Sequence, residues 1–438
     1  MLQYERCKTS YCVNKIITLM TTKTFILFLI AGSLLFSCTR STEMKTNKLK
    51  MSQWRGKYYA GVFDEKNLLK YWSEEGPAML WKADSIGNGY GSPIVYEDKL
   101  YVMGEKDSIG TLYAFDLNGK ELWKVNYGKE WGRYFPGSRS TPTIVDGLLY
   151  LESGFGRVVC MEATTGKEKW AVDMLKDLNG RNTNFGFSES PLVDEKNVYC
   201  MPGGHDTNVV ALDRMTGKIN WISKGMCEEP SYCSPIIIHL PERSILVTFS
   251  KQHLLGIDIK DGSLLWSDFQ HKDGDTHGNS PMYENYYNNH YIYYVAGDGQ
   301  RGVKLKLSDA GSKITALWRN KLFDNAYGGF VKQGDYLYGS GHRKKNWFSL
   351  NVRTGQICDS LKINRGITVM ADSMLYCYNE KGEIFLVKAR DGKMEKISSL
   401  KIKHGSKEHF AHPYIANGVL YIRHGKALMA FDIKRKAA

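Results

Sequence analysis

Eight positions along the chain carry side chains that could bind a ligand. Each lies three residues before the Pro, or the residue in its place, that begins the first strand of a recurring sequence unit. They are Tyr90, Arg139, Ser188, Tyr232, Gly278, Tyr327, Arg365 and Phe410. One position later the residues are mostly small, with Glu189 and Asn279 as the exceptions. Aromatic rings, two arginines and a carboxylate could stack on and hydrogen-bond a sugar, a quinone or a peptide.

The same residues also admit a structural interpretation, in which they only solvate one another and Arg139 forms an ion pair with Glu189. The candidate ligand-binding residues are Tyr90, Arg139, Glu189, Tyr232, Asn279, Tyr327, Arg365 and Phe410. We assign no catalytic residue, and no spacing of histidines, cysteines and carboxylates predicts a metal site.

These positions belong to an internal repeat, which decides the fold. Each unit contains a small residue and Pro, a short apolar strand, a Leu-Tyr strand, an apolar strand ending in an acidic residue, a Gly turn and a Trp. The first unit shows the pattern in Ser92-Pro93, Leu100-Tyr101, Asp116, Gly119 and Trp123. Further units follow as far as His412-Pro413, and the 27 Tyr, 10 Trp and 43 Gly favour short strands joined by glycine turns.

The two ends of the repeat complement each other. The last unit stops before its fourth strand, whereas the strand at Leu80-Trp81 precedes the first unit and has no unit of its own. Pairing the two would close a ring and leave no unpaired strand edge. We therefore predict an all-β, eight-bladed β-propeller with four-stranded antiparallel blades, closed by the Trp81 strand and the C-terminal blade. A count of seven would require dropping the degenerate sixth or seventh unit.

The Leu-Tyr, acidic-x-x-x-Gly-Lys and Trp pattern resembles the pyrroloquinoline-quinone-like propeller repeat, over roughly residues 54–434. The repeat serves quinone-dependent alcohol dehydrogenases, assembly scaffolds of the BamB type and many propellers without assigned activity. The resemblance implies that the repeated Trp packs between adjacent blades. The acidic residues at Asp116, Glu162, Asp213 and Asp258 precede turn glycines, where a carboxylate can accept backbone N–H bonds.

The dehydrogenases of this family hold calcium by Glu, Asn and Asp, cover the quinone with a disulfide of adjacent cysteines and use an Asp as general base. This chain has no adjacent cysteines and no C-x-x-C-H haem motif. We therefore expect no cofactor and favour a binding or scaffolding protein for an envelope protein, glycan or small-molecule ligand. The alternative is a quinone- or sugar-dependent oxidoreductase with pyrroloquinoline quinone and calcium.

The N-terminus predicts a bacterial lipoprotein. An apolar run of about a dozen residues from Phe25 to Phe36 follows Lys23 and ends in a lipobox at Leu35-Phe36-Ser37-Cys38. We expect a signal peptide over 1–37, with 1–19 open to interpretation as an over-extended gene start, a tether over 38–53 lipidated at Cys38, and a propeller over 54–438. Thr39 is not the aspartate that retains lipoproteins in the inner membrane, so we expect the outer membrane, facing the periplasm or the cell surface.

Charge and cysteines add two expectations. From Cys38 onward the chain has 55 basic and 45 acidic residues, and in an exported protein this excess favours anionic surfaces or ligands over nucleic acid. An oxidising compartment permits disulfides, and Cys227 and Cys233 are the closest pair. Whether they are bridged is open.

Overall fold

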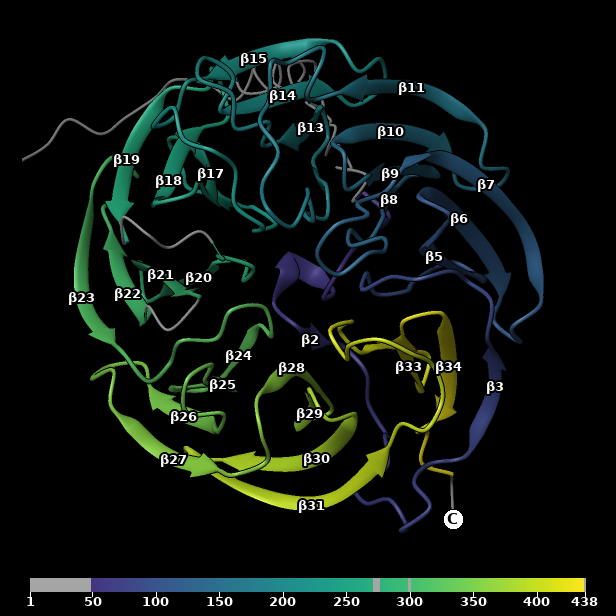
Figure 1. The fold of residues 1–438 in the computed structure, drawn as a ribbon. Helices are drawn as coiled ribbons and strands as arrows, with labels where there is room; N and C mark the ends of the chain where they lie inside the picture. The colour runs from purple at the N-terminus through teal and green to yellow at the C-terminus, as the bar shows by residue number, and fades with distance from the viewer. Residues whose placement is uncertain (1–48, 271–275, 298–300, 437–438) are drawn as a thin grey trace, which may run out of the picture. The chain divides into compact units, whose positions relative to one another are not determined.

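The computed structural model describes residues 49–270, 276–297 and 301–436. From Leu49 onward they form one compact unit of eight sheets around a common centre (Figure 1). The predicted eight-bladed, all-β propeller is confirmed. Within the described residues, no helix has the length and apolar character needed to cross a membrane. The predicted signal peptide, Cys38 and most of the tether lie outside the described residues.

The first four blades follow in chain order. Blade 1 contains β4 (Ile94–Tyr96), β5 (Lys99–Lys106), β6 (Ile109–Asp116) and β7 (Glu121–Lys129). Blade 2 contains β8 (Thr143–Val145), β9 (Leu148–Glu152), β10 (Arg157–Glu162) and β11 (Glu168–Asp173). Blade 3 contains β12 (Leu192–Val193), β13 (Asn197–Cys200), β14 (Val209–Asp213) and β15 (Ile219–Ser223). Blade 4 contains β16 (Ile236–His239), β17 (Ser244–Phe249), β18 (His253–Asp258) and β19 (Leu264–Phe269).

The other four blades include both degenerate units, which excludes a count of seven. Blade 5 contains β20 (Met282–Tyr286), β21 (Asn289–Ala296), β22 (Arg301–Leu307) and β23 (Ile314–Asn320). Blade 6 contains β24 (Phe330–Gln333), β25 (Tyr336–Ser340), β26 (Trp347–Asn351) and β27 (Ile357–Leu361). Blade 7 contains β28 (Gly366–Ala371), β29 (Met374–Asn379), β30 (Glu383–Arg390) and β31 (Lys393–Lys401). Blade 8 contains β32 (Tyr414–Ala416), β33 (Val419–His424), β34 (Ala427–Asp432) and, from the N-terminus, β3 (Met79–Ala83).

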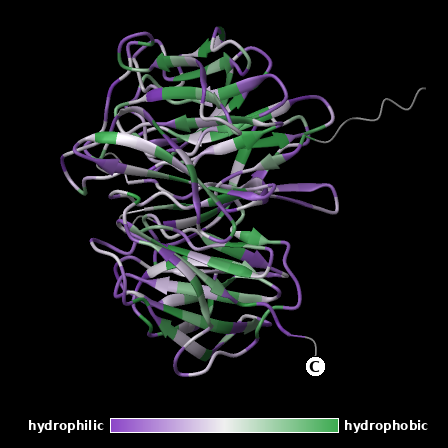
Figure 2. Ribbon diagram, turned by 90° about the vertical axis from the view of Figure 1, so that its right-hand side faces the viewer, coloured by the Kyte–Doolittle hydropathy of each residue, from purple (hydrophilic) through white to green (hydrophobic). Residues whose placement is uncertain are grey.

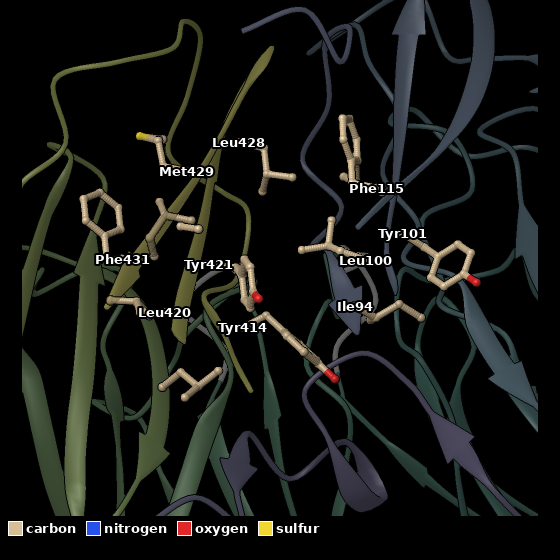
Figure 3. Close-up of a cluster of buried hydrophobic side chains, with 14 of the residues drawn as sticks. Ile94, Leu100, Tyr101, Phe115, Tyr414, Leu420, Tyr421, Leu428, Met429 and Phe431 are labelled. Atoms are coloured by element: carbon tan, nitrogen blue, oxygen red, sulfur yellow. The ribbon is translucent and has the colours of Figure 1, made fainter. Parts of the chain in front are cut away.

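The ring closes through β3, as the sequence predicts. This strand pairs antiparallel with β34, where Trp81 faces Ala430 and Lys82 faces Met429. Figure 3 shows the seam beside it, where side chains of β32–β34, such as Tyr421 and Leu428, face Leu100 and Phe115 of blade 1. N- and C-terminal strands thus share one blade, in which β3 covers the edge that β34 would otherwise expose.

The repeated tryptophans join most blades to the next through an indole hydrogen bond. The Trp81 indole N–H donates to Leu117 O in the β6–β7 turn of blade 1 at 2.8 Å. The same bond to the following blade recurs at Trp170, Trp221, Trp266 and Trp318, at 2.8 to 3.1 Å. The ring of Trp81 lies against Gly119, where a Cβ would meet it at 2.6 Å and φ is +85°. Glycine is required here both for that close approach and for the left-handed backbone.

The acidic turn residues also behave as predicted. Asp116, Asp213 and Asp258 each accept backbone N–H bonds from their own turns, whereas Glu162 accepts the Thr165 hydroxyl. Figure 2 shows the hydrophobic residues concentrated in the strands and the hydrophilic residues in the connecting loops.

The N-terminal segment enters the centre of the ring, which the sequence did not predict. β1 (Met51–Ser52) pairs antiparallel with β8, the innermost strand of blade 2, and β2 (Val62–Phe63) pairs parallel with β28 of blade 7. Between them lies a short 3-10 turn, η1 (Lys57–Tyr59). We call residues 50–63 the plug, and Figure 1 shows it in purple at the middle of the ring. Met51 and Ser52, which the sequence places in the tether, thus belong to the sheet of blade 2.

One face of the ring carries the candidate site. In an antiparallel blade, the loop that leads to the next blade and the turn between the second and third strands lie at the same end. Hydrogen bonds between the two kinds of loop confirm this. Gly154 N–H donates to Glu130, and Arg365 donates to His342, where Gly154 and His342 lie in second-to-third-strand turns and Glu130 and Arg365 in loops between blades. We call this end the mouth face.

Ring closure generates the first prediction. Replacing Trp81 by Ala removes its indole hydrogen bond and its packing against Tyr421 and Gly119, and should lower the free energy of unfolding by about 2 kcal/mol. Leu80→Ala is the matched control, because Leu80 is 51% exposed on the same strand and should change stability by less than about 0.5 kcal/mol. Urea unfolding midpoints measure both, and equal losses would contradict a special role for Trp81 in closure.

Candidate functional site

The aromatic residues predicted from the repeat lie together on the mouth face. The ring centroid of Phe410 lies 5.6 Å from that of Tyr90 and 4.8 Å from that of Tyr327. Two aromatics that the sequence analysis missed, Phe135 and Phe185, extend this group to Tyr232 through centroid distances of 5.6 to 6.0 Å. We call these six residues the aromatic cluster. Its members lie in the loops that lead from blades 1, 2, 3, 5, 7 and 8 to the blade that follows.

Phe135 and Phe185 do not occupy the aligned position before the inner strands, so the repeat could not reveal them. A local signal existed in the run Trp131-Gly-Arg-Tyr-Phe-Pro136, where aromatics stand between Gly and Pro in a loop. Tyr134 is 65% exposed and Phe135 39% exposed. Large exposed aromatics in a turn indicate an interaction surface more than a core.

Arg139 braces that turn. Its guanidinium donates to Tyr134 O and Phe135 O, both at 2.6 Å, and lies over the Tyr90 ring at 5.8 Å. Burial lowers the pKa of Arg139, and Glu130 partly offsets this. The ion pair of Arg139 with Glu189 is wrong, since no ion pair between described residues joins them. Arg139 instead fixes the backbone that presents Tyr134 and Phe135.

Glu189 is buried below the surface and is not a charged member of the mouth face. Its side chain is 1% exposed, and neither carboxyl oxygen has a hydrogen-bond partner. Burial, followed by repulsion from Glu152, raises its pKa well above the usual range. Burial also raises the pKa of Glu152, where repulsion from Glu130 adds to the effect. Burial and the nearby like charges thus both disfavour the ionised forms of these two side chains.

Asn279 and Arg365 have structural partners. The Asn279 amide donates to Asn325 O at 2.6 Å and its oxygen accepts Gly329 N–H at 2.8 Å, so it joins two mouth loops. Arg365 donates to Glu380 at 2.7 Å and lies close enough to Tyr327 for its charge to lower the pKa of that phenol against the larger, raising effect of burial. Arg365 thus borders the aromatic cluster, whereas Asn279 lies beneath it and is buried.

The plug fills the centre of the ring from within. Arg55 is 3% exposed and donates to Phe330 O at 2.9 Å, Thr368 O at 3.0 Å and His412 Nδ1 at 2.9 Å. A Cβ on Gly61 or Gly329 would overlap its guanidinium, and both glycines have positive φ. Burial lowers the pKa of Arg55 to about 9. The central part of the ring is thus occupied by the chain's own segment, tied to blades 6, 7 and 8.

Glu130 is the third buried carboxyl near the mouth face. It accepts hydrogen bonds from Tyr127 Oη, from Gly154 N at 2.8 Å and from Trp131 N at 3.3 Å. Burial raises its pKa to about 7, although these hydrogen bonds oppose the shift. It anchors the start of the loop that carries Tyr134 and Phe135.

Comparison with known proteins places the chain among propellers of this repeat type. The family model described as outer membrane protein assembly factor BamB matches residues 108–361. Quinoprotein alcohol dehydrogenase PedH of Pseudomonas putida (strain KT2440) is 30% identical over 128 residues, which cover 28% of this chain and 21% of PedH. Quinoprotein ethanol dehydrogenase of Pseudomonas putida is 28% identical over 102 residues, covering 23% of this chain and 16% of that enzyme. The chain thus spans about a fifth or less of the length of these curated relatives.

Solved structures share the fold. BamB from Moraxella catarrhalis superposes with a TM-score of 0.61 at 12% identity, covering 82% of this chain and 99% of that one. A europium-containing methanol dehydrogenase gives a TM-score of 0.64 at 11% identity, covering 86% and 90%. At such identities the likeness establishes the propeller and not the activity.

The described residues do not fit the calcium and quinone equipment of the dehydrogenases. The Asn279 oxygen already accepts the Gly329 N–H at 2.8 Å. No group of three His, Cys, Asp or Glu side chains in the described ranges is arranged to hold a metal ion. Cys227 and Cys233 are free thiols and are not bridged. The described part of the chain therefore lacks the donor set that the resemblance would require.

Glu130 generates a pH prediction. Its pKa is about 7 in the folded protein against 4.5 in the ordinary carboxyl, so the folded state keeps a proton that the unfolded chain loses between these values. The stability contributed by that proton is present below about pH 4.5 and is lost as pH rises to about 7, by at most about 3 kcal/mol.

The substitution Glu130→Gln keeps the side chain neutral at every pH. The variant should therefore lose less stability than the parent protein between pH 5 and 8, as measured by unfolding midpoints at several pH values. Glu121→Gln, on an exposed position of β7, should follow the parent profile. Parallel profiles for the parent protein and Glu130→Gln would assign the titration to another group.

Proposed function

We propose that this chain, which belongs to the family described as outer membrane protein assembly factor BamB, is a non-catalytic binding or scaffolding propeller of the bacterial envelope. Its mouth face binds a partner protein or a small ligand. A lipid at Cys38 holds the propeller at the outer membrane through the segment that follows.

The observation that carries this proposal is the Tyr134–Phe135 turn. Two exposed aromatic side chains stand on a backbone that Arg139 holds by two short hydrogen bonds. Rigid aromatic anchors dominate the binding energy of protein interfaces, because they contribute large apolar area at a small entropic cost. The brace and the neighbouring cluster rings leave this turn little freedom to lose on binding.

The interior supports binding at the surface over chemistry inside the ring. The plug occupies the centre through Arg55 and Tyr59, whose hydroxyl donates to Pro191 O at 3.0 Å. Burial raises the pKa of Glu152 and Glu189, and no group of three His, Cys, Asp or Glu side chains among the described residues is arranged to hold a metal ion. A ligand would meet the loops of the mouth face before any of these groups.

The third prediction tests the proposal with paired aromatic variants. Tyr134→Ala with Phe135→Ala should weaken partner binding by about 2 kcal/mol, or about 30-fold, while the urea midpoint stays near that of the parent protein. Tyr286→Ala with Tyr287→Ala is the matched control, because these rings are 43% and 84% exposed in the β20–β21 hairpin at the opposite end of blade 5.

The measurement is affinity capture from envelope extracts with the tagged full chain, read by quantitative mass spectrometry and followed by titration of the recovered partner. Stoichiometric partners lost only with the Tyr134/Phe135 variant would support the mouth face. A monodisperse protein that recovers no partner, or partners retained equally by both variants, would count against it.

The second candidate function is a quinone-dependent oxidoreductase, favoured by the 30% identity to PedH over 128 residues. Because the Asn279 oxygen is already engaged by Gly329 N–H and the described residues contain no metal-binding group of His, Cys, Asp or Glu side chains, we expect no binding of pyrroloquinoline quinone with calcium by calorimetry. We likewise expect no alcohol-dependent reduction of a dye. Saturable, calcium-dependent quinone binding would reverse this conclusion and favour the enzyme.

A further inference from the structure

Charge is distributed unevenly over the mouth face. The loops 341–346, 362–365, 380–382, 402–413 and 425–426 of blades 6 to 8 contain nine Lys or Arg and two Glu. We call these loops the basic sector. The described loops of blades 3 to 5, which are 201–208, 224–235, 250–252 and 321–329, contain three Lys and four Asp or Glu. This difference in charge lies in the loops and not in the strands that the repeat defines.

The positive charge of the basic sector is uncompensated. Glu380 is engaged by Arg365 at 2.7 Å, and Glu408 accepts the Tyr90 hydroxyl at 2.6 Å. Eight exposed side chains of the sector form no ion pair with a described carboxylate, namely Arg343, Lys344, Lys345, Lys362, Lys381, Lys403, Lys407 and Lys426. Like charges held this close repel one another, and an anionic partner would relieve that repulsion.

The structure holds the most basic turn in place. The carboxylate of Asp324 accepts the backbone N–H groups of His342 at 2.6 Å and of Arg343 at 3.3 Å. The turn 343–345 therefore projects three consecutive positive side chains from an anchored backbone. This reduces the ordering cost of binding them to an anion.

The basic sector adjoins the aromatic cluster. Phe410 belongs to the loop 402–413 of the sector and contacts Tyr327 and Tyr90. Arg365 of the sector lies near Tyr327. An apolar anchor site and a cationic rim thus meet on one face, which is the usual anatomy of a protein interface.

We infer that the mouth face binds an acidic protein segment, with an aromatic or aliphatic side chain of the segment on the aromatic cluster and its carboxylates on the basic sector. This inference rests on the proposed function and specifies the partner's chemistry. Charge complementarity across such a surface governs both the choice of partner and the rate of association.

Two observations favour a protein segment over other anions. The rings of the cluster meet at interplanar angles of 41°, 53°, 66° and 86°, so together they form no single flat platform for a sugar ring. The basic sector covers only one side of the mouth face, and a flat anionic membrane would also meet the acidic loops of blades 3 to 5.

The test uses the full chain in detergent and a fluorescein-labelled peptide in which Asp and Glu alternate with Ser and Gly around two Phe residues. Fluorescence anisotropy should show binding that weakens about tenfold or more when salt rises from about 50 to about 500 mM. Replacing both Phe by Ala, or every acid by Lys, in the peptide should each weaken binding. Binding that ignores all three changes would overturn the inference.

The site is tested by charge reversal. Arg343→Glu, Lys344→Glu and Lys345→Glu together should weaken peptide binding about tenfold or more. The matched control Lys196→Glu, Lys218→Glu and Lys260→Glu makes the same change in net charge in exposed turns of the opposite face and should leave binding within about twofold. Equal losses in both triple variants would indicate non-specific attraction and refute the site.

Other anions complete the test. Phosphatidylglycerol vesicles and polygalacturonate are tested in the same assay. If either binds more tightly than the peptide and loses affinity in the Arg343–Lys345 variant, the ligand of the mouth face is a lipid surface or a glycan and not an acidic segment. Captured partners that depend on Tyr134 and Phe135 while the peptide does not bind would leave the proposed function standing and reject this inference. The absence of both would reject the two together.

Discussion

The closure of the ring by β3 is the constraint on which the rest of the molecule depends. An open stack of eight sheets would expose the apolar faces of its first and last blades, whereas here one blade combines strands from both ends of the described chain and packs against blade 1. Closure forces the eight innermost strands to face a common centre. It also brings loops that are distant in sequence, such as 84–93 and 402–413, close enough for Tyr90 and Phe410 to touch.

The filled centre follows from this geometry. Innermost strands leave one edge unpaired, and the plug satisfies two of these edges through β1 and β2. Arg55 then spans the carbonyls of blades 6 and 7, and it carries a buried cation without a carboxylate among the described residues. Arg423 does the same between blades 8 and 1, donating to Gly91 O at 3.1 Å. Carbonyl dipoles solvate both cations, which is how a buried charge persists without an ion pair.

The fold could be predicted from sequence because each blade repeats the same local solution. Ser-Pro, Leu-Tyr and Trp recur at spacings that only a four-stranded unit explains, and the orphan Leu80-Trp81 strand accounts for closure.

The plug could not be predicted, since its strands are two residues long and Arg55, Tyr58 and Tyr59 have positive φ without a glycine signal. The burial of Glu189 was equally hidden, because position in a loop does not reveal depth. Phe135 and Phe185 of the aromatic cluster were missed for a related reason. Alignment of the repeats identifies positions that all blades have in common, whereas these two residues lie in loop segments that differ from blade to blade.

That division has a physical basis. The strands and the tryptophan bridges stabilise the ring in the same way in most blades, so the loops of the mouth face are free to differ without loss of the core. Beneath that face, burial raises the pKa of Glu152 and Glu189, and backbone carbonyls accept hydrogen bonds from the buried guanidinium of Arg55. The exposed positive charge of blades 6 to 8 lies instead in the loops at the rim. A molecule built this way offers a partner a fixed arrangement of charge and aromatic side chains on loops that the core does not constrain.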